Sequence, residues 1–387
     1  TILIVLLEPF YLGLSRAIHN DVLLSSFIFL SFLYGFEALG DEKISGKSVR
    51  INLFLSGVFM GLSMLTKSAG LFLVPFLFFV PFYFYISEKK KLSGLLLKLA
   101  IIFSASILTF VIVWPAMWVQ PINSLQMHFI DGIKGIGLEE GHGHIWFGKV
   151  TQDPGVLFYP VVLIARYSPV LIALFVLGFG YFIKNWKDID KTGKNLVSLC
   201  IIFIASYLLL MTFASKKLDR YSLPIVYPMA LVGTYYLRDI FKKKTIAVVS
   251  LFLIIFRVIL LYGLHPNYLA YYSPLVGGVE QGRYLIEPKW LIGYDKVAEY
   301  FNEKQKEEDS RIKVAIADFD YLKPFADFEV LNIRHKVERE KADYFILPIY
   351  RKDRNEFYKG AHDLQKSNDE ITVAGVEYYE IHKPKRD

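Results

Sequence analysis

The chain contains a succession of long apolar runs, each interrupted by a short polar segment. A helix that crosses a bilayer needs roughly 20 mostly apolar residues, because lipid offers no hydrogen-bonding partner to irregular backbone. Of the 387 residues, 54% are hydrophobic and only 21% are charged, which is typical of membrane proteins. We expect an apolar remnant at about 1–12 and eight spans, near 22–39, 51–66, 70–87, 97–115, 168–184, 195–214, 223–238 and 245–264. The sequence therefore predicts a mainly α-helical membrane protein, a helix bundle of several spans.

Lysine and arginine are distributed unevenly between alternate loops. The loops 40–50, 87–98, 184–194 and 238–244 contain 15 of these residues, whereas the intervening loops contain eight over a greater length. Because basic loops stay on the cytoplasmic side, we expect the first set inside and the second set outside. These basic residues lie beside membrane spans, and this placement argues against nucleic acid as a partner, despite the formal charge of +7.

The composition changes after about residue 264, where charged residues become frequent and no apolar run is long enough to span. We expect a membrane core over 1–264 and an extracytoplasmic α/β accessory domain over 265–387. The spacing of apolar residues predicts a helix over 294–308. The expected strands are 313–319, 328–333, 343–350 and a pair about Ala374 and Gly375, with a further helix over 356–367.

The loop 115–167 is long and rich in aromatic residues that suit the headgroup layer. The pattern of segment 122–133 predicts a short helix lying in that layer. The glycines in the middle of the loop suit a mobile lid over a site. His142 and His144 lie close together in "GHGHIWFG". Two histidines on a loop lack a full ligand set, so a divalent metal has weak support and we prefer substrate contact for both.

Basic residues stand at the outer ends of several spans. These are Arg16, Lys67, Lys216, Lys217 and Arg220. Each can be a side chain that reaches the interface from an apolar helix. As a group they would form a positive mouth that suits a lipid phosphate or another anion.

Acidic residues accompany this positive mouth. Asp21 in "SRAIHND" directly precedes an apolar run, which is typical of a helix start, and a functional role is compatible with capping. Glu8 lies before Pro9 at membrane depth, where carboxylates are usually paired; Arg16 is a candidate partner. Arg257 lies deep in the last span, which indicates a buried pair or a water-filled cavity.

Several segments, taken in order, resemble one family. They include "EPFYLGLSRAIHNDVLL", "LSMLTKSAGLFLVP", "WPAMWVQP", "GHIWFGKVTQDPGVLFYPVVLIARYSP", "SKKLDRYSLPIVYP" and "HPNYLAYYSPLVGG". Together they look like the bacterial and archaeal relatives of protein O-mannosyltransferases and of the lipid A aminoarabinose transferase. These belong to the GT-C class of membrane glycosyltransferases. The segment "IGYDKVAEYFNE" departs from relatives that carry a Gly-Trp-Gly run there.

The resemblance implies transfer of a sugar, with inversion, from a polyprenyl-phosphate-linked donor to a protein, lipid or glycan acceptor on the outer face of the plasma membrane. No cofactor is implied. Asp21 matches the family's second acidic site and is expected to support catalysis. The main base is expected in a first outer loop, before Thr1, since the chain begins inside an apolar run without a methionine.

The resemblance also implies roles for other residues of the outer mouth. Donor phosphate binding is expected from Arg16, Lys67, Lys217 and Arg220. Candidates for substrate contact are Glu8, His19, His142, His144 and Tyr221.

Two other classes of function compete with the glycosyltransferase. A transporter or flippase of lipid-linked sugars favours internal repeats and polar sites at the midplane, whereas this chain has no repeat and places its polar residues at the outer ends. The third hypothesis is a non-catalytic membrane scaffold with an outer domain. Sugar transfer in membranes separates the three.

Overall fold

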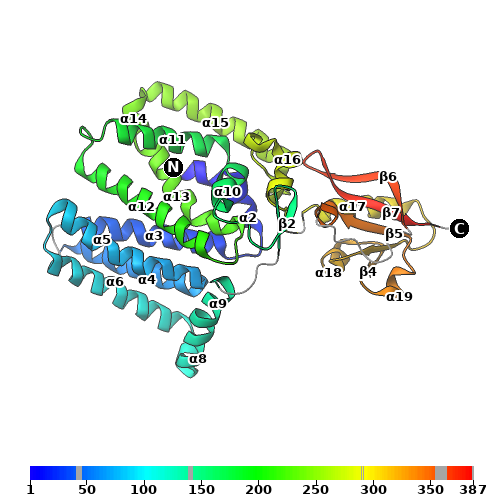
Figure 1. Ribbon diagram of the computed structural model, residues 1–387, viewed down its shortest axis with the longest axis horizontal. Helices are drawn as coiled ribbons and strands as arrows, with labels where there is room; N and C mark the ends of the chain where they lie inside the picture. Colours follow the sequence, from blue (N-terminus) through cyan, green and yellow to red (C-terminus); the bar gives the residue numbers. More distant parts are fainter. Residues whose placement is uncertain (41–45, 138–142, 289, 291, 354–363, 386–387) are drawn as a thin grey trace. The chain divides into compact units, whose positions relative to one another are not determined.

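The computed structural model describes all residues except 41–45, 138–142, 289, 291, 354–363 and 386–387 (Figure 1). The chain divides into two units. The first comprises Thr1–His142 and Asp153–Arg257, and the second comprises Gly143–Gln152 and Val258–Asp387. Each unit is described by itself below.

The first unit is helical. Its α-helices are α1 (Ile2–Leu6), α2 (Pro9–Arg16), α3 (Asp21–Gly40), α4 (Lys47–Thr66), α5 (Leu73–Glu88), α6 (Leu92–Val113), α7 (Ala116–Val119), α8 (Pro121–Leu125), α9 (Gly132–Gly137), α10 (Phe158–Arg166), α11 (Pro169–Lys184), α12 (Lys191–Phe213), α13 (Val226–Tyr235), α14 (Leu237–Ile240) and α15 (Lys243–Leu264). Two 3-10 helices, η1 (Ser68–Phe72) and η3 (Asp219–Ile225), and a π-helix, η2 (Gln126–Asp131), complete it. The last of these α-helices, α15, crosses the boundary between the units at Arg257 and Val258.

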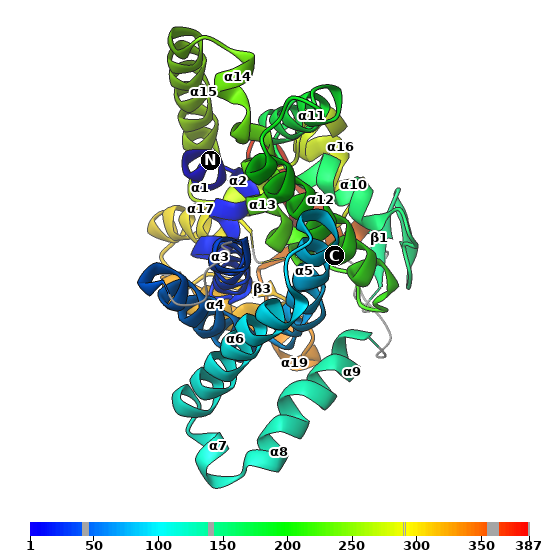
Figure 2. The same ribbon diagram turned by 90° about the vertical axis from the view of Figure 1, so that its left-hand side faces the viewer.

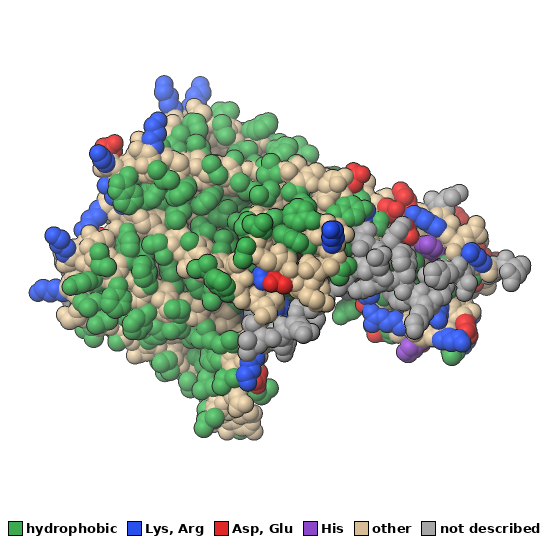
Figure 3. Space-filling model, in the orientation of Figure 1, with side chains coloured by type: hydrophobic (Ala, Val, Ile, Leu, Met, Phe, Trp, Pro, Cys, Tyr) green, Lys and Arg blue, Asp and Glu red, His purple; other side chains and the backbone are tan. Residues whose placement is uncertain are grey.

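Among the described residues, six helices are long and apolar enough to cross a membrane, which makes the chain an integral membrane protein. They are Asp21–Gly40, Lys47–Thr66, Ser68–Glu88, Leu92–Val113, Lys191–Phe213 and Lys243–Leu264. Each overlaps a predicted span. The predicted span 168–184 corresponds to α11, which joins α10 at a bend of 115°. The visible face of the helical unit is largely apolar, as expected for a surface in contact with lipid (Figure 3).

The prediction of a single span over 223–238 is wrong. Residues Asp219–Ile225 form the 3-10 helix η3, and α13 then provides only ten residues before the chain turns into α14. Pro224 lies inside η3 and Pro228 in the first turn of α13. A proline cannot donate a backbone hydrogen bond, so it is best accommodated near the start of a helix. The apolar remnant at 1–12 is likewise divided, into α1 and α2, at Glu8 and Pro9.

Small residues allow α4 and α6 to approach closely. Gly57 and Gly61 are four residues apart and lie on one face of α4. A Cβ atom added at Gly57 would lie 2.6 Å from Ala105 Cβ, and one added at Gly61 would lie 2.6 Å from Ser106 O. Close packing of backbones is a main source of helix association where the solvent is lipid.

The four basic loops of the sequence lie at one end of this bundle. Lys90 donates to the carbonyl of Gly40, and Lys191 lies 3.4 Å from Glu88, so the ends of α3 and α5 and the start of α12 meet. A Cβ at Gly193 would lie 3.1 Å from the ring of Tyr235, which places the start of α12 beside the end of α13. The alternation of basic loops along the chain thus reflects the two ends of one bundle.

The segment after α6 reverses direction. Figure 2 shows the chain turning at α7, so that α8 and α9 lead back from it. The imidazole of His128, in the π-helix, lies 2.5 Å from the carbonyl oxygen of Met64 at the end of α4. The predicted helix over 122–133 is therefore present, built from α8, the π-helix and the start of α9.

The second unit contains a mixed five-stranded sheet in the order β4-β3-β5-β7-β6. The strands are β3 (Lys313–Ile316), β4 (Glu329–Asn332), β5 (Tyr344–Pro348), β6 (Leu364–Val373) and β7 (Val376–Pro384), with β1 (His144–Trp146) and β2 (Lys149–Thr151) as a separate pair. Its helical segments are η4 (Tyr268–Ala270), η5 (Pro274–Val276), α16 (Gly278–Leu285), α17 (Tyr294–Lys306), α18 (Phe319–Leu322), η6 (Lys323–Phe325), α19 (Lys336–Arg339) and α20 (Ile349–Asp353). Strands β4, β3 and β5 are parallel, and β5, β7 and β6 are antiparallel.

The predicted elements of this unit are confirmed with one exception. The helix α17 buries Val297 and Phe301 against the sheet, as its spacing predicts. The turn between β6 and β7 consists of Ala374 and Gly375, both at positive φ, which suits a tight hairpin. The helix predicted over 356–367 is wrong for residues 364–367, which belong to strand β6; the rest of it lies outside the described residues.

Candidate functional site

Asp21 is the first residue of α3 and lies at the end of the bundle opposite the four basic loops. The preceding Asn20 donates a hydrogen bond of 2.7 Å to the carbonyl of Thr66, which fixes this turn against the end of α4. Asp21 is only 3% exposed. A helix N-terminus favours a carboxylate, because its unpaired N–H groups carry partial positive charge. The predicted helix start at this residue is confirmed.

Three side chains from different segments converge on the Asp21 carboxylate. Lys67, directly after α4, donates a hydrogen bond of 2.8 Å to Oδ1. Arg220 of η3 places Nε 3.2 Å from Oδ2, and His19 places Nδ1 2.9 Å from the same oxygen. We call Asp21, Lys67, Arg220 and His19 the Asp21 cluster.

The Asp21 cluster carries an excess of positive charge. Lys67 and Arg220 supply two cations against one carboxylate, so within these four residues the positive charges outnumber the negative ones by one when His19 is neutral. The Lys67 and Arg220 side chains are 17% and 20% exposed, whereas that of Asp21 is 4% exposed. The cations thus lie nearer the surface, and the carboxylate lies beneath them and holds them together. This arrangement suits an anion that approaches from outside.

Burial controls protonation in the cluster. Burial lowers the pKa of the Lys67 ammonium, its ion pair with Asp21 opposes this, and Arg220 and Lys216 lower it further. Burial also lowers the pKa of the His19 imidazole; Asp21 opposes the shift, and Arg220 and Lys67 add to it. His19 is therefore neutral at pH 7 and leaves the charge of the site to Lys67 and Arg220.

A second layer of side chains fixes Arg220. Asp219 accepts a hydrogen bond of 2.8 Å from the backbone N–H of Arg220, and its other oxygen lies 3.0 Å from Nε of Arg166. Both Asp219 and Arg166 are buried. The ammonium of Lys67 lies 4.5 Å from the centre of the Tyr221 ring, a distance that favours a cation–π contact. Tyr221 thus packs beside the Asp21 cluster and lines the site.

Lys217 has a different partner. It is 3% exposed and donates a hydrogen bond of 2.9 Å to Asp153, a residue of the long loop. It also donates to the carbonyl of Ala214. Its charge is therefore compensated in this arrangement, and its expected role in phosphate binding stays a prediction. The contact ties the long loop to the segment that precedes η3.

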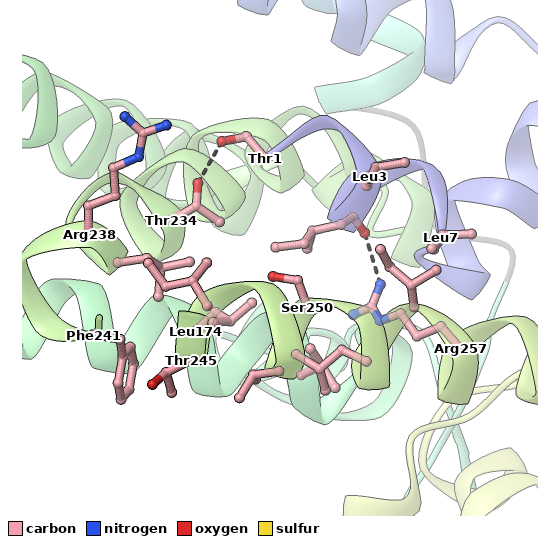
Figure 4. A pocket seen from close by; sticks show the side chains of 17 residues that line it. Thr1, Leu3, Leu7, Leu174, Thr234, Arg238, Phe241, Thr245, Ser250 and Arg257 are labelled. Atoms are coloured by element: carbon pink, nitrogen blue, oxygen red, sulfur yellow. Dashed lines mark hydrogen bonds between the residues drawn. The ribbon is translucent and has the colours of Figure 1, made fainter. Parts of the chain in front are cut away.

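Glu8 is paired with Arg257 rather than with Arg16. Arg257 Nη2 lies 3.2 Å from Glu8 Oε2, and Ser168 donates to both Glu8 oxygens, from its backbone N–H and its hydroxyl, at 2.7 Å. Both charged groups are almost fully buried. Sequence proximity favoured Arg16, but Arg257 of α15 reaches the carbonyl of Ile4 in α1 (Figure 4) and the Glu8 carboxylate that follows that helix. The buried pairing expected for Arg257 is confirmed.

The remaining candidates are Arg16, His142 and His144. Arg16 is exposed in the last turn of α2. His144 is buried in β1 of the second unit, whereas the Asp21 cluster belongs to the first, and His142 lies outside the described residues. In the part of the chain that the structure describes, no three His, Cys, Asp or Glu side chains are grouped to hold a metal ion.

Sequence reasoning missed Asp219 and Arg166. Both carried a signal, because a charged residue between apolar runs is usually paired. Asp219 stands in "KKLDRY" between Lys217 and Arg220, both predicted to bind phosphate. Arg166 stands in "VVLIARYSP". The sequence does not reveal that these two residues pair with each other.

The fold and the cluster define an integral membrane protein with an anion-complementary site at one end of its helix bundle. The family model of the dolichyl-phosphate-mannose-protein mannosyltransferases matches residues 1–131, about a third of the chain. The matched part includes His19, Asp21 and Lys67 and ends before Arg220. No curated protein and no solved structure matches the chain.

Proposed function

We propose that the protein is a membrane glycosyltransferase that uses a polyprenyl-phosphate-linked sugar as its donor. The observation that carries the proposal is the placement of Lys67 and Arg220 over the single carboxylate of Asp21 at one end of the bundle. The match of residues 1–131 to a family of dolichyl-phosphate-mannose-dependent enzymes supports the same chemistry. The GT-C class and the resemblance to the lipid A aminoarabinose transferase are part of this proposal.

The cations of the site suit the leaving group of this reaction. The bond between the sugar C1 and the phosphate oxygen breaks, and the electron pair leaves with the polyprenyl phosphate. An acceptor oxygen forms the new bond to C1 on the opposite face, which inverts the configuration, and passes its proton to a base. Lys67 and Arg220 stabilise the charge that develops on the phosphate. Because a phosphate is already a stable anion, no general acid is needed.

Asp21 has a supporting role in this mechanism. Its carboxylate is buried beneath the two cations, accepts a hydrogen bond from Lys67 and forms an ion pair with Arg220, so it orients them toward the phosphate. Both oxygens of this carboxylate are already engaged, Oδ1 by Lys67 and Oδ2 by Arg220 and His19. We therefore assign proton abstraction to another group and the arrangement of the phosphate site to Asp21.

The reaction takes place on the outer face of the plasma membrane in this proposal. The excess of lysine and arginine in the four loops at the other end of the bundle supports this orientation. The second unit then lies outside the cell, where its sheet domain would contact the acceptor or cover the membrane core. Mannose and a protein acceptor are the first choice from the family match, with a lipid or glycan acceptor and other sugars as alternatives.

Transfer of labelled sugar tests the proposal. The protein in membrane vesicles is supplied with polyprenyl-phosphate [³H]mannose and a panel of protein, lipid and glycan acceptors, with vesicles lacking the protein as the control. Label in one acceptor class, with polyprenyl phosphate released in equal amount, supports the proposal. Movement of the labelled lipid between leaflets without any transfer would contradict it and favour a flippase.

A further inference from the structure

A cavity of about 590 Å³ lies in the first unit, at the turn that follows α6. In the described part of the chain its lining comes entirely from residues 114–128, the stretch in which α7, α8 and the π-helix η2 lead back from α6 (Figure 2). The cavity is therefore a product of this turn alone. Its volume falls within the range of about 300–1,000 Å³ that is usual for small-molecule sites.

The aromatic wall of the cavity is held in place by its neighbours. The Trp114 ring packs edge-to-face against Phe110 of α6, with ring centres 5.4 Å apart, and lies 5.4 Å from the ring of His128. The His128 imidazole in turn donates to the carbonyl of Met64 at the end of α4. The indole is thus ordered before a ligand arrives, which reduces the entropy that binding would cost.

The rest of the lining offers neutral hydrogen-bonding groups. Gln120 and Asn123 are exposed, and the Asn123 amide donates to the side-chain oxygen of Gln120 at 3.3 Å. Ser124 adds a hydroxyl. Amides and hydroxyls both donate and accept hydrogen bonds. Among the described residues, no Lys, Arg, Asp or Glu lines the cavity, so its chemistry suits a neutral ligand rather than an ion.

We propose that this cavity binds a neutral hexopyranose ring, with Trp114 against its C–H face and the amides of Gln120 and Asn123 on its hydroxyls. A hexopyranose has the two properties that the lining combines. Its axial C–H bonds form an apolar face, which the negative face of an aromatic ring attracts. Its rim carries hydroxyls that both donate and accept. A free sugar and the headgroup of a neutral glycolipid present the same ring.

The cavity lies at the same end of the bundle as the Asp21 cluster. A Cβ atom added at Gly132, four residues after His128, would lie 3.2 Å from Ser68, the neighbour of Lys67. The sugar site is nevertheless distinct from the phosphate site, because no member of the Asp21 cluster lines the cavity. The proposal therefore does not depend on the proposed transfer reaction.

Saturation-transfer NMR measures this binding. The whole protein in lipid nanodiscs is titrated with methyl β-D-glucopyranoside, and empty nanodiscs are the blank; alkyl glycoside detergents are avoided because they carry the proposed ligand. Saturation should pass to the sugar, most strongly to the axial protons of one face. Inorganic phosphate should not compete, because no cation lines the described cavity. Glucosyl diacylglycerol added to the nanodiscs separates the two sources, since only a headgroup that enters the cavity displaces the glucoside.

Three variants locate the sugar. Trp114→Leu, which keeps an apolar side chain but removes the ring, should abolish saturation transfer. Asn123→Ala should weaken the affinity roughly 2- to 13-fold, the ratio that corresponds to one neutral hydrogen bond of about 0.5–1.5 kcal/mol. Gln126→Ala is the matched control and should bind as the wild type does, since Gln126 is an exposed amide of the same segment that does not line the cavity. Because Asn123 is exposed, its variant keeps the test valid even if Trp114→Leu is unstable.

Three results would overturn the proposal. No saturation transfer to the glucoside above that of empty nanodiscs would show that the protein does not bind the ring. Equal weakening in Asn123→Ala and Gln126→Ala would show that the general polar surface of the segment holds the sugar. A wild-type signal in Trp114→Leu, together with its loss in Arg220→Gln, would place the sugar at the Asp21 cluster instead of the cavity.

Discussion

Lys67 donates a hydrogen bond of 2.8 Å to Asp21 across 46 residues of sequence. The bond joins the end of α4 to the start of α3, two helices that run antiparallel and are linked at their far ends. Arg220 meets the same carboxylate from η3, so three segments share one buried anion. The positive surface above Asp21 is therefore a product of the fold of the whole bundle.

Asp21→Asn should reduce the turnover of sugar transfer by about 100-fold. The amide does not neutralise Lys67 and Arg220, which then repel each other and lose the geometry that stabilises the leaving phosphate. Initial rates with polyprenyl-phosphate mannose measure the effect. Asp188→Asn, at an exposed position between α11 and α12, is the control and should have wild-type rates. Wild-type turnover in Asp21→Asn would remove Asp21 from the site.

Arg220→Gln should lower kcat/KM for the donor by roughly 10- to 150-fold. This range corresponds to the loss of one hydrogen bond to a charged group, about 1.5–3 kcal/mol. The kcat/KM of Arg220→Lys should lie between those of Arg220→Gln and the wild type, because a lysine keeps the charge but loses the planar set of donors. The donor concentration is varied at saturating acceptor. An unchanged donor KM together with an unchanged kcat would contradict phosphate binding at Arg220.

Asp219→Asn should impair transfer by misplacing Arg220, since Asp219 accepts from the Arg220 backbone and pairs with Arg166. Two residues that act as one unit give non-additive losses. The double variant Asp219→Asn/Arg220→Gln should therefore be about as slow as Arg220→Gln alone. The kcat/KM values of the wild type, the two single variants and the double variant together form a double-mutant cycle. Fully additive losses would show that Asp219 acts independently of Arg220.

Glu8→Gln should destabilise the protein by about 3–5 kcal/mol, because it leaves the buried guanidinium of Arg257 without its counter-charge. The double variant Glu8→Leu/Arg257→Met should recover much of this loss, since two apolar side chains need no partner. Thermal unfolding in detergent measures the Tm of the wild type, of Glu8→Gln and of the double variant, and so ranks their stability. A double variant less stable than Glu8→Gln would show that the pair has a role beyond mutual compensation.

His19 should make the protein less stable as the pH falls below about 6.5, the ordinary pKa of histidine. Its pKa is lowered in the folded state, first by burial, so between pH 6.5 and the lower folded value the unfolded chain binds a proton that the folded chain does not. Stability therefore rises with pH across this window. The Tm of the wild type should fall more between pH 7.5 and pH 5 than that of His19→Gln. Equal falls would rule out this linkage.

The sequence by itself determined the local elements and their environment. Apolar runs long enough to cross a bilayer became six spans, because no other structure satisfies the backbone in lipid. The apolar spacing of α17 and the turn at Ala374 and Gly375 were equally readable. The sequence also placed Lys67 and Arg220 at the ends of apolar runs, where a charged side chain has least cost.

Only the tertiary structure decided which charges meet. Glu8 pairs with Arg257, 249 residues away, rather than with the nearby Arg16, and Asp219 turns out to hold Arg166. Prolines made 219–235 a 3-10 helix followed by a short α-helix, which carries Arg220 to Asp21. Local patterns report how a segment meets lipid or solvent, whereas an ion pair depends on the packing of segments that are distant along the chain.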